Sequence, residues 1–301
     1  MNFAELIESA TKIKRKTIAV AQAADLDVLQ AVTEASSKGI ADFILIGQEA
    51  EITELLKGIG SSTEEFHIID EPNIKRCCQL AVQLVRDGEA DIVMKGLVST
   101  ADLLKAVLSK EHGLRASDLI SHVAAFEVEH YDRLILVTDS AMNIAPSLTE
   151  KAAIIENAVK VAHSLGISCP KVAPVCAVEV VNPNMPSTLD AAALALMNQR
   201  GQLKGCVVDG PLALDNALSL EAATHKGIVS EVAGYADILA VPSIEVGNIL
   251  YKSLIYFAKA KVGAIIVGAK APIILTSRAD SAEAKLYSIA LASLYADQEN
   301  R

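Results

Sequence analysis

A short segment near the end of the chain combines residue types that could bind an anion. An apolar run, residues 273–275, is followed by Thr276, Ser277 and Arg278, and a helical pattern begins at about Asp280. This order places two hydroxyls and a guanidinium between a strand end and a helix N-terminus, where free backbone N–H groups and the positive end of the helix dipole converge. The planar Arg group also matches phosphate oxygens. The segment therefore predicts a phosphate site.

The same segment has a structural interpretation as well. Asp280 is expected to be the N-cap of the helix, with Glu283 closing a capping box, and Arg278 would then be a surface charge. The two interpretations are compatible, because an anion site at a helix N-terminus requires a well-formed helix start.

A second candidate phosphate site follows another apolar run. Residues 95–100, with the sequence KGLVST, lead from a predicted strand into a helix. Gly96 permits close backbone approach, Ser99 or Thr100 could cap the helix, and Lys95 could reach a phosphate. The run is not a Walker A loop, because the order G-x-x-x-x-G-K-S/T is missing. A tight strand–helix turn with a solvated Lys is the structural alternative.

Residues 142–150, with the sequence MNIAPSLTE, precede a long helical pattern. Ser147 and Glu150 predict a capping box there, and Pro146 stiffens the entry to the helix. Asn143 is harder to explain structurally, although Asn tolerates turn conformations.

Two glycine-containing runs are less specific. Asp209, Gly210 and Pro211 form a turn after an apolar run. Gly247, followed by Asn248, lies inside a helical pattern, where Gly costs up to about 1 kcal/mol relative to Ala. Gly at that position would allow close approach of a ligand or of a neighbouring backbone.

Apolar runs of strand length alternate with helical patterns nearly throughout. Strands are predicted at residues 17–21, 43–46, 91–94, 134–137, 172–176, 206–208, 238–241, 264–267 and 273–275. Helical patterns include residues 25–37, 75–86, 149–164, 187–198, 244–259 and 280–295. Continuously apolar strands separated by helices predict an α/β fold with mainly parallel sheets and flanking helices. Most of the polar motifs follow strand ends, the edge at which open α/β sheets bind ligands.

The composition excludes several classes of protein. The 301 residues are 51% hydrophobic and 4% aromatic, which allows a large aliphatic core in two domains or one large unit. A net charge of −10 argues against binding to nucleic acid or to an anionic membrane surface. No apolar run approaches the roughly 18 residues of a membrane span, and the N-terminus lacks a signal-peptide core, so we expect a cytoplasmic protein.

The cysteines and histidines are scattered. The five cysteines are Cys77, Cys78, Cys169, Cys176 and Cys206. They lack metal-ligand spacing, and the six histidines form no close pair, so we expect buried free thiols and no metal site. No Ser-His-Asp order or Cys–His pair indicates a nucleophilic enzyme.

Together these motifs resemble the phosphate acetyl/butyryltransferase family, and most of all its phosphate butyryltransferase branch. The resemblance extends from about residue 16 to about residue 296, and its specific parts are residues 95–100, 139–146, 177–183, 208–212, 247–252 and 276–280. The family implies a two-domain α/β subunit similar in fold to the isocitrate and isopropylmalate dehydrogenases, with the active site in the cleft between the domains. The domains are predicted as residues 1–138 with 278–301, and residues 139–277.

The reaction implied by the resemblance is reversible acyl transfer, in which acyl-CoA and inorganic phosphate give acyl phosphate and CoA. Coenzyme A thioester is a substrate, and no bound cofactor, metal or covalent enzyme intermediate is implied. In the acetyl branch a Ser-Arg pair at the start of the last helix serves the site, and Ser277 and Arg278 match it. Ser277 would donate a hydrogen bond at the reacting carbonyl or phosphoryl oxygen, and Arg278 would bind phosphate.

Other motif residues complete the predicted site. The remaining predicted phosphate ligands are Lys95, Ser99 and Asn143. The residues predicted to line the substrate cleft are Asp209, Gly210, Gly247 and Asn248.

One position departs from the family pattern. In the acetyl branch an Asp beyond the Ser-Arg pair is thought to take the proton of the CoA thiol, and Ala284 aligns with it here. Asp280 and Glu283 are the nearest carboxylates, and both have capping explanations. A thiol with a pKa of about 8.5 needs little help at neutral pH, so electrostatic stabilisation could supply most of the rate.

We therefore expect a homo-oligomeric phosphate acyltransferase, a dimer or larger, that prefers a butyryl-like acyl group. A phosphate acetyltransferase using acetyl-CoA is one alternative. An NAD(P)-dependent dehydrogenase of the same fold is another, although neither an Asp-x-x-x-Asp metal-ligand run nor G-x-G-x-x-G occurs. A phosphate-binding protein that has lost its activity is a third, suggested by Ala284.

Overall fold

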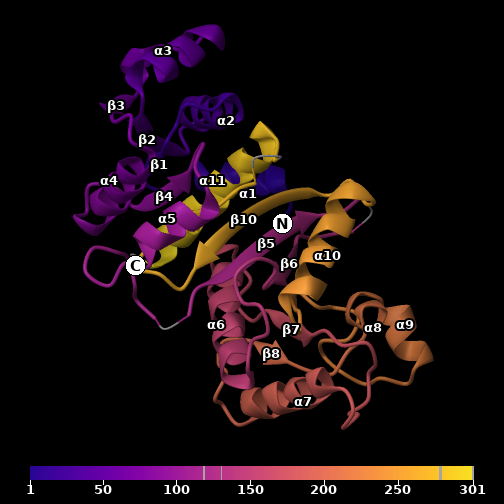
Figure 1. Cartoon of the computed structure of the whole chain (residues 1–301). Coiled ribbons are helices and arrows are strands. Elements are labelled where there is room, and N and C mark those ends of the chain that lie inside the picture. Colours follow the sequence, from indigo (N-terminus) through magenta and orange to yellow (C-terminus); the bar gives the residue numbers. More distant parts are fainter. Residues whose placement is uncertain (118, 130, 278–279, 300–301) are drawn as a thin grey trace. The chain divides into compact units, whose positions relative to one another are not determined.

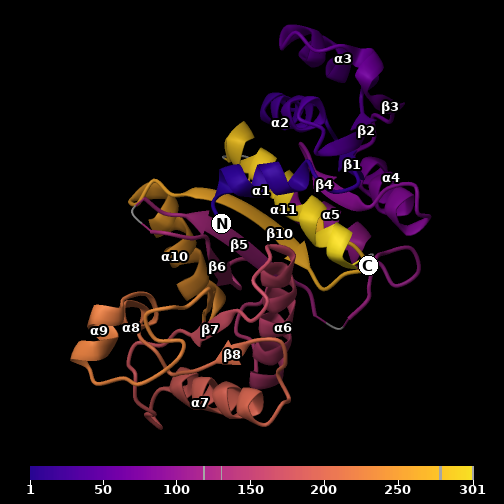
Figure 2. The ribbon, with the colours of Figure 1, turned by 180° about the vertical axis from the view of Figure 1, so that it is seen from behind.

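The computed structural model describes residues 1–117, 119–129, 131–277 and 280–299. Its contacts divide the chain into two compact units. Unit 1 is Leu119–Lys261 together with Met1–Asn2, and unit 2 is Phe3–Asp118 together with Val262–Arg301. Figures 1 and 2 show the elements of both units from opposite sides. The predicted division into domains, at residues 138–139 and 277–278, stays a prediction.

Unit 2 contains a mainly parallel sheet with helices on both faces. Its strands, in spatial order, are β3 (His67–Asp70), β2 (Ala41–Gly47), β1 (Lys16–Ala21), β4 (Ile92–Lys95), β11 (Ile273–Ile274) and β10 (Lys261–Val267). Every neighbouring pair is parallel except β10 and β11. Its helices are α1 (Phe3–Ala10), α2 (Leu26–Ser37), α3 (Glu49–Gly58), the short 3-10 helix η1 (Thr63–Glu65), α4 (Ile74–Arg86), α5 (Thr100–Val107) and α11 (Ala282–Glu299).

The register of β4 fixes which residues share one edge of this sheet. Ala21, at the end of β1, lies opposite Lys95, and Ile274, at the end of β11, lies opposite Met94. Because the three strands are parallel, their carboxyl ends meet at the same edge. The residues that follow β1, β4 and β11 are therefore neighbours, although the sequence separates them widely.

Helix α11 is the central helix of unit 2. Every residue from Lys285 to Ala296 is buried, as expected for a helix that is apolar or small on all sides. It contacts α1, α2, β1, β4 and β11, and it lies beside α1 in both views (Figures 1 and 2). The Phe3 ring stacks on the Tyr287 ring with 4.0 Å between centroids. Helix α4 packs on β1, β2 and β4, and α5 packs against α4.

Unit 1 is also an α/β unit. Its strands, in spatial order, are β5 (Ser121–Glu127), β6 (Ile135–Thr138), β9 (Ile238–Ala240), β7 (Lys171–Pro174) and β8 (Val207–Val208). β5 and β6 are antiparallel, and the other neighbouring pairs are parallel. Its helices are α6 (Leu148–Ser164), α7 (Pro186–Gln199), α8 (Leu214–Leu218), α9 (Leu220–His225) and α10 (Ile244–Tyr256).

Two helices cover opposite faces of this sheet. The Asn157 amide of α6 donates to the Ser121 hydroxyl at 2.9 Å, whereas the Tyr251 ring of α10 meets the Phe126 ring edge-on at 5.2 Å. Side chains alternate between faces along a strand, so Ser121 and Phe126 point to opposite sides of β5. The predicted α/β fold with mainly parallel strands and flanking helices is confirmed.

The thiols are only partly buried. Cys77 and Cys78 are buried, and burial raises the pKa of the Cys78 thiol to about 11. Cys176 and Cys206 are half-buried, and Cys169 is exposed, so the expectation of buried thiols is wrong for Cys169. Within the described ranges, no helix is both long enough and apolar enough to cross a membrane.

Candidate functional site

Two predicted phosphate ligands meet at the carboxyl edge of the unit 2 sheet. Lys95 is the last residue of β4, and Ser277 follows β11, the neighbouring parallel strand. Lys95 is buried, with 5% of its surface exposed, whereas Ser277 is exposed. The predicted partner of Ser277, Arg278, lies outside the described residues. The structure therefore brings together a buried cation and an exposed hydroxyl at the edge where such sheets bind ligands.

The turn that carries Ser277 is closed by Asp280. The Asp280 carboxylate accepts a hydrogen bond from the Ser277 backbone N–H at 2.7 Å, and the Asp280 N–H donates to the Ser277 carbonyl at 3.2 Å. Helix α11 begins only at Ala282, and the Ser281 hydroxyl accepts from the Ala284 N–H at 3.2 Å, as an N-cap side chain does.

The predicted cap at Asp280 is therefore wrong, because its carboxylate bonds back to Ser277 and the helix starts later. The capping box with Glu283 is wrong for the same reason. The Glu283 carboxylate instead accepts from the Tyr287 hydroxyl at 2.5 Å, one turn further along α11.

Two buried ammonium groups surround this turn. Lys285, only 2% exposed, donates from Nζ to the Asp280 carbonyl. Burial raises the pKa of the Asp280 carboxyl, while the Ser277 N–H and the charges of Lys285 and Lys95 act in the opposite direction. Among the described residues, Lys95 and Lys285 both lie near the Asp280 carboxylate, and their positive charge favours an anionic ligand in a chain of net charge −10. Sequence reasoning missed Lys285; its signal is a lone cation in an otherwise apolar stretch of helix.

The neighbouring turn after β1 adds a second residue that sequence reasoning missed. Gln22 has a left-handed backbone with φ of 57°, which is uncommon for a residue other than Gly. Its carbonyl accepts from the Leu97 N–H at 2.7 Å. A Cβ on Gly96 would lie 2.0 Å from the same carbonyl oxygen, so only Gly fits there. The predicted role of Gly96, close backbone approach, is met by this neighbouring turn.

Two buried side-chain oxygens lie at this edge of the sheet, and that of Gln22 is close to Gly47 at the end of β2. The Gln22 Oε1 and Thr276 Oγ1 atoms have no hydrogen-bond partner within the described part of the chain. They follow β1 and β11, the two strands that pair with β4. Unpaired buried polar atoms are rare, and the one on Thr276, which directly precedes Ser277, supports a ligand-binding role for this edge. The signal for Gln22 in the sequence is a polar residue directly after an apolar strand.

Ser99 is engaged in capping. It is the N-cap of α5, where its hydroxyl accepts from the Asp102 N–H at 3.0 Å and donates to the Asp102 carboxylate at 2.6 Å. The predicted cap is thus confirmed at Ser99, and its role as a phosphate ligand stays a prediction.

In unit 1 the loop after β6 is organised around Asp139, which is 3% exposed. Its Oδ1 accepts from the backbone N–H groups of Ala141 and Met142 at 2.9 and 3.0 Å. Its Oδ2 accepts from the backbone and side-chain nitrogens of Asn143 at 3.2 and 2.6 Å. The Asn143 amide also donates to the Ile120 carbonyl at 3.0 Å. Asn143 therefore uses its side-chain N–H groups to hold the loop, and its predicted phosphate contact stays a prediction.

Gly247 lies against this loop. A Cβ at Gly247 would lie 2.6 Å from the Asp139 carbonyl oxygen and 2.8 Å from the Ser140 Cα, so Gly allows α10 to approach the loop backbone. The following residue, Asn248, is exposed on α10. Their predicted place in the substrate cleft stays a prediction.

Asp209 and Gly210 lie apart from that loop. They follow β8, where the Asp209 carboxylate accepts from the Gly210 N–H at 2.9 Å. Strands β9 and β7 separate β8 from β6, which corresponds to roughly 14 Å at the usual strand spacing. Unit 1 therefore does not bring Asp209 next to Asn143.

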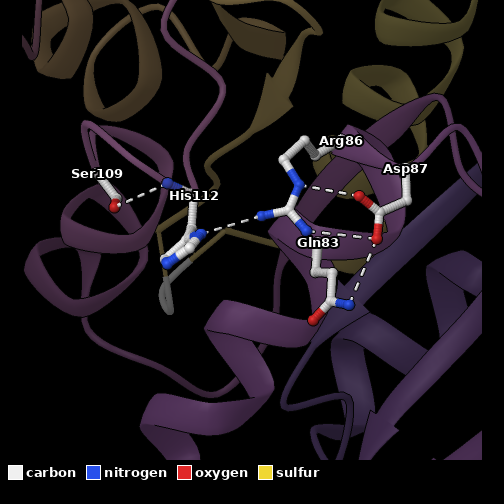
Figure 3. A network of polar contacts seen from close by, with 5 residues as sticks. All are labelled: Gln83, Arg86, Asp87, Ser109 and His112. Atoms are coloured by element: carbon white, nitrogen blue, oxygen red, sulfur yellow. Dashed lines mark hydrogen bonds and ion pairs between the residues drawn. The ribbon is translucent and has the colours of Figure 1, made fainter.

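A further polar network lies on a groove of about 540 Å³ between α4 and α5 (Figure 3). The Arg86 guanidinium pairs with Asp87 at 2.9 Å and approaches the His112 ring at 3.4 Å, and Gln83 donates to Asp87 at 3.3 Å. A cation at the end of α4 is favourable to the helix dipole, and exposed pairs of this kind contribute little to stability. Among the residues described, no group of His, Cys, Asp and Glu side chains could hold a metal ion.

The fold and this edge define an α/β protein whose polar and cationic side chains gather at the carboxyl ends of parallel strands. The family model described as phosphate acetyl/butaryl transferase matches residues 2–79 and 72–293, and the chain belongs to this family. The expected family and the expected class, acyl transfer to phosphate, are confirmed.

Individual relatives agree with this assignment. The chain is 56% identical to a phosphate butyryltransferase of Clostridium acetobutylicum over 98% of both chains. It is 47% identical to a phosphate acetyltransferase of Thermotoga maritima, over 98% of this chain and 100% of that one. Among solved structures, a branched-chain phosphotransacylase from Enterococcus faecalis is similar with a TM-score of 0.83 and 38% identity, covering 93% of this chain and 99% of that one.

Proposed function

We propose that this chain catalyses the reversible transfer of a short-chain, butyryl-like acyl group between coenzyme A and inorganic phosphate. The observation that carries the proposal is the meeting of buried Lys95 and exposed Ser277 at the carboxyl edge of the unit 2 sheet. The 56% identity to a phosphate butyryltransferase, against 47% to a phosphate acetyltransferase, favours the butyryl group over acetyl. No bound cofactor is required, and assembly into homo-oligomers in the cytoplasm stays a prediction.

The proposed roles follow from charge and position. Lys95 and Lys285 supply positive charge near the phosphate, and Arg278, which matches the Ser-Arg pair of the family, binds phosphate oxygens through its planar fork. Ser277 donates a hydrogen bond to the oxygen on which negative charge develops. Phosphate binding of this kind orients the attacking oxygen toward the thioester and raises its effective concentration.

The proposed chemistry needs no covalent enzyme intermediate. A phosphate oxygen attacks the thioester carbonyl carbon, a C–O bond forms, and the carbonyl oxygen carries the negative charge until the C–S bond breaks. CoA then leaves as a thiolate and takes a proton from solvent. Because the thiol pKa is about 8.5, the thiolate is an adequate leaving group at neutral pH. The reverse reaction follows the same steps, with the thiolate attacking acyl phosphate.

The test is CoA release from acetyl-, propionyl-, butyryl-, isobutyryl- and valeryl-CoA, each with and without phosphate. We expect release to require phosphate, and butyryl-CoA to exceed acetyl-CoA in kcat/KM by about 10-fold or more, the range expected for added methylenes in an apolar pocket. Release that is independent of phosphate would show a hydrolase. No release from any thioester, together with reduction of NAD or NADP by a hydroxy acid, would favour the dehydrogenase alternative.

A further inference from the structure

Between β11 and α11, Asp280 forms hydrogen bonds with both the backbone N–H and the backbone carbonyl of Ser277. The Asp280 carboxylate accepts a hydrogen bond from the Ser277 N–H at 2.7 Å, and the Asp280 N–H donates to the Ser277 carbonyl at 3.2 Å. Both backbone polar groups of Ser277 are thus bonded to Asp280. The backbone from which the Ser277 side chain projects is therefore held by the acceptor atom of residue 280.

The side chain of Asp280 does not cap helix α11. The hydroxyl of Ser281 caps α11 by accepting the Ala284 N–H at 3.2 Å. The Asp280 backbone is held in place independently, because Lys285 donates from Nζ to the Asp280 carbonyl. A substitution of Asp280 should therefore alter the hydrogen bonding of Ser277 and leave the cap of α11 in place.

The charge of Asp280 gives no advantage in binding an anion. A carboxylate beside a phosphate site repels the ligand, and partial burial of this group raises its pKa. The buried ammonium groups of Lys95 and Lys285 compensate the charge. The carboxylate oxygen at this position instead accepts the hydrogen bond from the Ser277 N–H.

We propose that Asp280 is a positioning residue, whose side-chain oxygen fixes the backbone of Ser277 so that the Ser277 hydroxyl faces the substrate. The inference rests on the proposed function, and it differs from the assignment of Asp280 as a helix cap or as a base that removes the thiol proton. What matters in this role is the place of one acceptor oxygen and not the negative charge.

Two conservative variants separate position from charge. Asp280→Asn keeps an acceptor oxygen at the same distance from the backbone but removes the charge, and we expect kcat within about threefold of wild type with an unchanged pH profile. Asp280→Glu keeps the charge but moves the acceptor by one methylene, and we expect kcat to fall by about 10- to 100-fold, as for a misplaced catalytic group. Ser281→Ala is the matched control: it removes the adjacent cap and should leave kcat within about twofold.

The opposite ranking would overturn the proposal. If Asp280→Asn loses about a hundredfold or more in kcat together with a basic limb of the pH profile, while Asp280→Glu retains activity, Asp280 acts as a base. If both variants keep wild-type kcat, the side chain has no part in positioning Ser277.

Hydrogen exchange of the Ser277 amide provides a reading that needs no activity. We expect protection of this N–H in wild type and in Asp280→Asn, and its loss in Asp280→Glu, because protection follows the hydrogen bond. Equal exchange in all three proteins would contradict the positioning role even if the chain proves to have another substrate. A wild-type enzyme that shows the expected exchange pattern but releases no CoA would refute the proposed function alone.

Discussion

The loops after β6 and after β11 both start at the carboxyl end of a strand, and in both an Asp accepts backbone N–H groups. After β6 the buried Asp139 carboxylate accepts from Ala141, from Met142 and twice from Asn143. After β11 the partly exposed Asp280 carboxylate bonds to the N–H of Ser277, whose side chain remains exposed. The first loop directs its polar groups inward, and the second holds one side chain out.

The groups that surround the two carboxylates also differ in charge. Asp139 is satisfied by amide N–H groups, whereas Asp280 lies near the ammonium groups of Lys95 and Lys285. A carboxylate bonded to amides stabilises a loop, while ammonium groups near a sheet edge attract an anion. We infer that substitutions after β6 act mainly on stability, and that substitutions after β4 and β11 act mainly on activity.

The largest effect is expected for Asp139→Ala. This change leaves several N–H groups of a partly buried loop without their buried acceptor, and a buried group left in this way costs about 1–3 kcal/mol. We expect the free energy of unfolding to fall by about 3 kcal/mol or more in urea titrations. Asp139→Asn, which keeps one acceptor oxygen, should lose less. An unfolding midpoint of Asp139→Ala equal to that of wild type would show that the loop is not held by this carboxylate.

The next largest effect is expected on activity, for Lys95→Met. Met fills a similar volume without charge, and Lys285 still lies beside Asp280 to compensate its charge, so we expect a smaller change in stability than in activity. Loss of one charged hydrogen bond to phosphate should lower kcat/KM by about 1.5–3 kcal/mol in transition-state free energy, mainly through a higher KM for phosphate. A marked drop in the unfolding midpoint with normal phosphate kinetics would make Lys95 structural and remove the contrast with Asp139.

Much of the fold could be predicted because strand-length apolar runs are a strong signal. Each of the nine predicted strands overlaps a strand of the structure. β3 and β5 were not predicted. β3 is an edge strand with exposed His67 and Asp70 at its ends, and β5 opens with the buried polar pair Ser121 and His122. In both segments polar residues interrupt the apolar run, although the segment still pairs with a neighbouring strand.

The two predicted capping boxes show where local pattern stops being sufficient. The box of Ser147 and Glu150 is present, with the Glu150 carboxylate accepting the Ser147 N–H at 2.7 Å. The box of Asp280 and Glu283 is not, because Ser281 offers a competing cap one residue later and Ser277 competes for the carboxylate. A sequence with two adjacent cap residues does not say which one the helix uses.

The candidate site could be predicted only in part for a similar reason. Lys95 and Ser277 carry local signals, since each follows an apolar run and precedes a helix. Gln22 and Lys285 carry weaker signals, a polar residue after an apolar strand and a lone cation in an apolar stretch of helix, and their place at this edge of the sheet depends on the strand order and on burial of α11. The predicted location of the active site between two domains stays a prediction.

A smaller effect is expected from the caps themselves. Ser147→Ala and Ser281→Ala each remove an acceptor for a helix N-terminal N–H, and each should cost about 1 kcal/mol of unfolding free energy. Neither should change kcat by more than about twofold, because neither side chain contacts the proposed phosphate site. Urea titration and steady-state kinetics on the same preparations check both statements. A large loss of activity in Ser281→Ala with little loss of stability would move Ser281 from the helix start into the site.

The smallest effect is expected in the dependence of stability on pH, and it tests the difference between the two carboxylates directly. Burial raises the pKa of the Asp280 carboxyl in the folded chain above its unfolded value of about 3.9. The folded state then binds the proton more tightly, so the contribution of this group to stability is fully present below the unfolded pKa and is lost as pH rises through the folded pKa. Asn at this position does not titrate.

Between about pH 4 and pH 7, wild type should therefore lose stability relative to Asp280→Asn, and the difference between their urea midpoints should change in that direction alone. Ser281→Ala removes no titrating group and should differ from wild type by the same amount at every pH. A wild type that gains stability relative to Asp280→Asn as pH rises would mean that Ser277, Lys285 and Lys95 outweigh burial. In that event the negative charge of Asp280, and not only the position of its oxygen, would stabilise the turn. The loop after β11 would then resemble the loop after β6 more closely than we infer.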